Sequence, residues 1–144
     1  MFGLFLWWGT RKVIEDVRGI RNKNPGNIER GSDRWQGMAD DQSDSRFVVF
    51  DSPEYGIRAM ARILNSYANR GLVTVDEIIS TWAPPFENDT QSYITSVSRR
   101  IGIEPDKPLT DADYPQLIAA IIHHENGINP YSQELIQRGI ELAA

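Results

Sequence analysis

Residues 52–142 carry a series of helix patterns, and this succession constrains the fold more than any other feature of the chain. Ser52 and Pro53 begin the first pattern, apolar residues then recur at helical spacing, and Gly71 ends it. Later patterns start at Thr74, at the cap Asp89, at Pro115 and at the cap Ser132, and stop before Pro84, at Gly102, at Glu125 and near Leu142. A weaker helix is predicted over residues 11–17. The sequence therefore predicts a mainly helical domain.

Residues 19–50 have a different character, because Gly, Asn, Asp, Ser and Arg dominate them. Asn24-Pro25-Gly26-Asn27 is a strong turn signal. Residues 35–37 and 47–50 are predicted to form two short strands joined by a polar loop. The expected fold class is thus α+β, with a small β-lobe over residues 20–50, a helical lobe, and a cleft between them.

The N-terminal residues 1–9, MFGLFLWWG, are apolar but far short of the roughly 20 residues that cross a membrane. Arg11 and Lys12 follow this run, whereas a secretory signal has its basic residues first. We expect residues 1–17 to form an apolar segment and short helix packed on a domain of residues 18–144. The alternative is a tip that contacts a membrane or a partner through its two tryptophans.

Composition excludes several classes of function. The 144 residues suit one domain, and the absence of cysteine excludes disulfides and thiolate chemistry. His123 and His124 are the two histidines, too few to build a tetrahedral zinc site alone. The net charge is −5, which argues against a nucleic-acid partner. We expect no cofactor and no metal.

One carboxylate is placed unusually. Ile118, Ile121 and Ile122 form an inward stripe on the fourth helix pattern, and Glu125 is the next position on that stripe. Partial burial and the negative helix end both favour the protonated form of an acid there. A protonated carboxylic acid is what general acid catalysis of glycoside cleavage requires. The simpler alternative is that Glu125 turns out to solvent at the helix end.

Three segments together resemble the lysozyme-like superfamily of peptidoglycan-cleaving enzymes, and especially its bacterial and phage glucosaminidase branch. The first is RGIRNKNPGNI at residues 18–28 with WQG behind it, the second is FVVFDSPEYGI at 47–57, and the third is WAPPFENDT at 82–90 with Tyr93. More narrowly, the chain resembles a phage virion-associated lytic protein over residues 18–142. The resemblance implies a lysozyme-like fold and cleavage of cell-wall glycan strands.

The chain departs from that pattern in one respect. In the resembling enzymes the catalytic helix precedes the Asn turn, but here the matching segment, LIAAIIHHENG at 117–127, lies near the C-terminus. We therefore expect a circular permutation with Glu125 as the acid, which is compatible with closely spaced chain ends. The ordinary order, with Glu15 as the acid, is the alternative.

The resemblance also implies roles for other residues. Tyr93 is expected beside the acid, and a core aromatic is its alternative. The candidate sugar-binding residues are Asn88, Thr90, Trp35, Trp82, Tyr131 and Asn27. For each of them the alternative is a structural role in core packing, helix capping or the turn. A second carboxylate is sought among Asp40, Asp41, Asp44 and Glu87. It can also be absent, with the substrate's acetamido group or 6-hydroxyl taking its place as in lytic transglycosylases.

The resulting expectation is a monomeric muramidase, glucosaminidase or lytic transglycosylase that acts on bacterial peptidoglycan. Without an export signal, it would reside in a phage virion or the host cytoplasm and act in the periplasm, with other virion proteins as further partners. The rival hypothesis is a non-catalytic virion protein or glycan-binding module of the same fold. A peptidase is less favoured, because the sequence offers no nucleophile or metal site for one.

Overall fold

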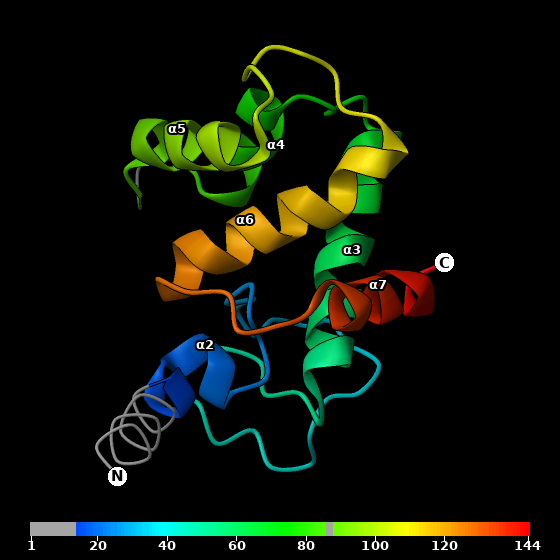
Figure 1. Ribbon diagram of the computed structural model, residues 1–144. Coiled ribbons are helices and arrows are strands. Elements are labelled where there is room, and N and C mark those ends of the chain that lie inside the picture. The colour runs from blue at the N-terminus through cyan, green and yellow to red at the C-terminus, as the bar shows by residue number, and fades with distance from the viewer. Residues whose placement is uncertain (1–13, 86–87) are drawn as a thin grey trace, which may run out of the picture.

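A computed structural model describes residues 14–85 and 88–144 of the chain (Figure 1). The elements in order are α2 (Arg18–Arg21), α3 (Pro53–Asn69), α4 (Val75–Trp82), α5 (Thr90–Ile101), the short 3-10 helix η1 (Asp111–Asp113), α6 (Tyr114–Asn126) and α7 (Gln133–Leu142). The prediction of a mainly helical protein is confirmed. The expectation for an N-terminal apolar segment and short helix over residues 1–17 falls mostly on residues 1–13, which lie outside the described residues.

The helix ends follow the local signals closely. Thr74 and Glu77 form a reciprocal capping box at the start of α4. The side chains of Asp89 and Ser132 accept hydrogen bonds from the backbone N–H groups of Ser92 and Leu135, each at 3.1 Å. These caps satisfy backbone donors that a helix start leaves without partners. For the helices predicted within residues 52–142, the boundaries are therefore confirmed to within about two residues. Helix α2 has no counterpart among the predicted helices.

Helix α6 runs through the middle of the molecule, with α5 on one side and α2 and α7 on the other (Figure 1). Its apolar residues are buried on more than one side, as expected for a helix in the core. Long buried side chains of α3, α4 and α5 pack in the same cluster: Ile57, Met60, Leu64, Ile78, Ile79 and Val97. This core fixes α6, and with it the position of Glu125, relative to the neighbouring helices.

The loop region, residues 22–51, differs from the predicted β-lobe. In the described part of the chain, strand pairing amounts to two isolated antiparallel bridges, Glu29 with Phe47 and Met38 with Phe50. The reason is that side chains satisfy much of the backbone there. The amide of Gln42 bonds the carbonyls of Ala39 and Val49 at 2.8 Å each and accepts from the Val49 N–H at 2.9 Å. Such bonds compete with strand ladders.

Two buried polar residues complete this loop region. The Asn24 side chain accepts from the Ile28 N–H and donates to the carbonyls of Ile28 and Val48, at 2.8–3.0 Å. Asp44 accepts from the backbone N–H groups of Arg46 and Phe47 at 2.8 and 2.9 Å. The loop region is thus a defined structure without continuous strands.

Candidate active site

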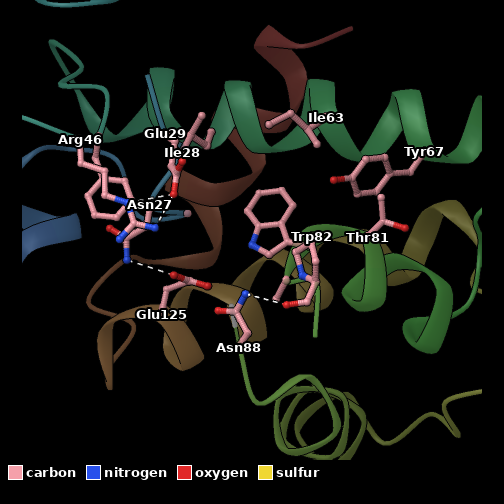
Figure 2. A pocket seen from close by; sticks show the side chains of 14 residues that line it. Asn27, Ile28, Glu29, Arg46, Ile63, Tyr67, Thr81, Trp82, Asn88 and Glu125 are labelled. Carbon is pink, nitrogen blue, oxygen red and sulfur yellow. Dashed lines mark hydrogen bonds and ion pairs between the residues drawn. The ribbon is translucent and has the colours of Figure 1, made fainter. Parts of the chain in front are cut away.

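A groove of about 530 Å³ lies between the loop region and helices α3, α4 and α6. Figure 2 shows Glu125 and Asn27 at one end of it, Trp82 in the middle, and Tyr67 and Thr81 toward the other end. The cleft that the sequence predicts between two parts of the molecule therefore exists, although one of its walls is made of loops.

Glu125 lies in the last turn of α6 and is half-buried at the groove. Its Oε2 atom accepts a hydrogen bond from the Tyr93 hydroxyl at 2.7 Å. Its Oε1 atom accepts one from the Asn27 side-chain amide at 3.0 Å. Both oxygens are therefore held by donors from other segments, and the carboxylate does not turn away into open solvent.

Tyr93 is a buried residue of α5 that reaches Glu125 with its hydroxyl. Burial raises the pKa of Tyr93 well above its ordinary value, and the adjacent Glu125 carboxylate raises it further. The phenol therefore stays protonated at neutral pH and remains available as a hydrogen-bond donor to Glu125.

Asn27 is aimed at Glu125 by an unusual backbone conformation. Its φ is 50°, in the left-handed region that asparagine adopts more readily than most other side chains. The turn approaches α2 so closely that a Cβ atom on Gly19 would lie 2.9 Å from the Asn27 Oδ1 and 2.3 Å from the Asn126 Oδ1. A larger residue at position 19 would displace these side-chain oxygens, so the glycine there helps to place Asn27.

Glu29, which the sequence analysis does not single out, lines the same groove. Its Oε1 atom accepts a hydrogen bond from the Arg46 Nε at 2.9 Å. The ring of Phe47, also on the groove wall, lies 4.9 Å from the Arg46 guanidinium and 4.6 Å from that of Arg18. No local signal marks Glu29, because the alternation of side chains along an extended segment would turn Ile28 and Glu29 to opposite faces, whereas both line the groove.

The predicted sugar-binding residues divide into two sets. Trp82 and Asn88 line the groove together with Asn27. Thr90 is buried, and its hydroxyl donates to the Ala83 carbonyl at 2.5 Å, so it secures the start of α5. Trp35 packs against the core. Tyr131 lines a separate cavity beside α7, where burial raises its pKa to about 12.

Of the predicted second carboxylates, the three that the structure describes do not line the groove. Asp44 is buried in an ion pair with Arg18, with both guanidinium contacts at 2.7 Å. These bonds, followed by those from the Phe47 N–H and the Asn22 amide, hold the pKa of Asp44 well below its usual range. Asp40 and Asp41 are exposed and do not line the groove, and Glu87 lies outside the described residues. Asp44 therefore stabilises the loop region through its ion pair and hydrogen bonds.

The described residues contain no group of three His, Cys, Asp or Glu placed to hold a metal ion. Over residues 14–85 and 88–144, no helix has both the length and the apolar character needed to span a membrane.

The sequence is similar to that of a phage protein. No protein-family model matches the chain. The sequence is 45% identical to Protein P5 of Pseudoalteromonas phage PM2 over 134 residues, which span 90% of this chain and 84% of that protein.

Proposed function

We propose that this chain, which belongs to the family of Protein P5 of Pseudoalteromonas phage PM2, cleaves the glycan strands of bacterial peptidoglycan with Glu125 as general acid. The observation that carries the proposal is a half-buried carboxylate at a groove, with one oxygen held by Tyr93 and the other by Asn27. The family places the chain among phage proteins, and phages must breach the cell wall of their host.

The two donors support this role through the charge that develops during the reaction. As Glu125 passes its proton to the glycosidic oxygen, negative charge forms on its carboxylate. The Tyr93 hydroxyl and the Asn27 amide already point at the two oxygens, so they stabilise that charge without reorganising. The Tyr93 hydroxyl can also accept a hydrogen bond, so it can remain bonded to either protonation state of Glu125.

Glu29 is the carboxylate we assign to the second role. It lines the groove from the loop region, whereas Glu125 comes from α6. An anionic group on the far side of the sugar can stabilise positive charge at the anomeric carbon or activate a water molecule. Trp82 and Asn88 supply an aromatic face and an amide for binding N-acetylated sugars. Reaction through the substrate's own acetamido group or 6-hydroxyl would leave Glu29 dispensable.

We also propose that the fold is lysozyme-like in a permuted chain order. The supporting observation is that α6, which follows the loop region in the chain, contacts α2, which precedes it. The acid-bearing helix and the Asn turn are thereby adjacent in space, as the resemblance requires.

The decisive experiment is zymography on purified peptidoglycan with Glu125→Gln, which keeps the size of the side chain but removes the transferable proton. The rate should fall by about 100- to 10,000-fold, the usual contribution of a general acid. Glu104→Gln, at an exposed position after α5, is the matched control and should leave the rate unchanged. Glu15→Gln tests the unpermuted order. Loss of activity in Glu15→Gln but not in Glu125→Gln would reject the permutation.

Mass spectrometry of the products then defines the reaction. Reducing ends indicate hydrolysis, anhydro-muramyl ends indicate transglycosylation, and freed amines indicate a peptidase. A protein that binds glycan but leaves peptidoglycan intact would instead be a binding component of the virion, and the catalytic proposal would fail.

A further inference from the structure

Helix α6 presents two consecutive side chains to the same tyrosine. Glu125 accepts the hydrogen bond from the Tyr93 hydroxyl at 2.7 Å. His124 covers the face of the ring, because the two ring centroids are 3.7 Å apart and the planes differ by 24°. The phenol of Tyr93 is thus held at its tip by one residue and at its face by the residue before it.

The stack has a clear physical consequence. A tyrosine hydroxyl is carried at the far end of a rigid ring, so a small tilt of the ring displaces the oxygen and misaligns its hydrogen bond. Tyr93 is buried, whereas His124 is exposed and stacks on the outer face of the Tyr93 ring. A flat imidazole packed on the ring restricts that tilt and excludes water from one face of the phenol.

We propose that His124 is a positioning residue, which acts through Tyr93 to hold the phenol hydroxyl on Glu125. This inference rests on the proposed function, because it assigns a support to the same acid. It does not require His124 to touch the substrate or to carry a proton. The stacking surface of the ring is the part that matters.

The neighbouring histidine provides a matched control in the same helix turn. His123 is engaged elsewhere, with its Nε2 2.9 Å from a terminal nitrogen of Arg100. Burial, followed by the charge of Arg100, lowers the pKa of His123. The two histidines therefore differ in what they contact, and only His124 contributes to the stack on Tyr93.

The test uses the full chain and three variants. His124→Ala should lower kcat on soluble glycan fragments by about tenfold while KM changes less than about twofold, because positioning acts on the chemical step. His124→Phe restores a flat ring and should recover most of kcat. His123→Ala should retain the parent kcat. A parent-like kcat in His124→Ala, or no recovery in His124→Phe, would overturn the proposal.

A second readout is independent of catalysis. The Tyr93 phenol can be titrated by NMR in protein labelled at the tyrosine Cζ carbon, with Tyr93→Phe to assign the signal. Removing the ring in His124→Ala should expose Tyr93 and lower its pKa toward the ordinary value of about 10, and His124→Phe should reverse this. If the parent protein cleaves no glycan, the proposed function fails. This titration still tests whether His124 shields Tyr93. An unchanged Tyr93 pKa in His124→Ala would show that the His124 ring does not shield Tyr93, and the positioning role would be rejected.

Discussion

The helical region, residues 53–142, and the loop region, residues 22–51, are stabilised in different ways. The helices enclose a continuous apolar core in which residues such as Ile57, Ile78 and Ile121 are fully buried. Apart from Thr90, the buried polar side chains of the described residues all lie in the loop region: Asn22, Asn24 and Asp44. Removal of apolar area from water stabilises the first region. The second region also places Ile28, Val48 and Phe50 in the apolar core, but it adds directed hydrogen bonds from buried polar side chains.

This difference explains why the two regions contribute different features to the groove. The apolar core makes α6 a rigid support for Glu125. The hydrogen-bonded loops can present Asn27 in a conformation that a regular strand does not allow, with a positive φ, directly before the segment that carries Glu29. A site between the two regions combines a fixed acid with precisely directed polar groups.

The largest effect on stability should come from the helical core. Ile121→Ala removes a fully buried side chain at the centre of α6, which should lower the free energy of unfolding by about 3–4 kcal/mol. Urea unfolding monitored by circular dichroism measures the change. Ile103→Ala, at a half-buried position, should cost clearly less. Equal losses in the two variants would contradict the assignment of Ile121 to a tightly packed core.

A polar residue of the loop region should be nearly as important. Asn24→Ala leaves the N–H of Ile28 and two backbone carbonyls without their side-chain partner inside the protein, at a cost of about 2–3 kcal/mol. The same unfolding assay applies, with Asn65→Ala on the exposed side of α3 as control. A loss below about 0.5 kcal/mol, as expected for a surface substitution, would show that hydrogen bonds do not stabilise this region.

Close packing of α2, the short helix that precedes the loop region, against both regions gives a third prediction. Gly19→Ala would bring a Cβ atom 2.3 Å from the Asn126 Oδ1 and 3.1 Å from the Asn24 carbonyl oxygen, so the asparagine side chains or α2 must shift, at a cost of about 1–2 kcal/mol. The shift should also reduce peptidoglycan cleavage, because Asn27 lies on the same contact. Gly31→Ala, where no heavy atom lies within 4 Å, should change neither quantity. A Gly19→Ala protein with parent stability and activity would show that the approach of α2 is loose.

The smallest expected effect is on the loss of thermal stability at low pH. Asp44 has a folded-state pKa below its unfolded value, so its stabilising contribution is complete above about pH 4 and is lost as the pH falls further. The melting temperature of the parent should therefore drop more steeply below about pH 4 than that of Asp44→Asn, by a few degrees. Melting curves between neutral pH and pH 2 test this, with the exposed Asp106→Asn as control. Identical curves for parent and Asp44→Asn would contradict the prediction.

The predictions from sequence succeeded where the determining contacts are local. The capping box of Thr74 and Glu77 and the cap at Ser132 join residues that are three positions apart. The strand predictions for residues 35–37 and 47–50 were the weakest part, because the side chains of Asn24, Gln42 and Asp44 take over backbone bonds. The alternation of apolar and polar residues does not reveal which polar side chains will point inward and bond the backbone.

The candidate site shows the same division. The isoleucine stripe of α6 correctly indicates that Glu125 faces inward, since helical spacing alone decides that. The assignment of Asp44 as a catalytic candidate overlooked its ion pair with Arg18, 26 residues away. Glu29 was missed because its place on the groove depends on how the loop region packs against α6.

Local sequence patterns specify where the helices begin and end, and which side of α6 carries Glu125. Those features depend on side chains within a turn of one another, whose spacing is fixed by helix geometry. The partners of Glu125 depend instead on long-range packing, because Tyr93 and Asn27 are 32 and 98 residues away along the chain. Contacts at such separations arise from the packing of the whole core, and no local pattern encodes them.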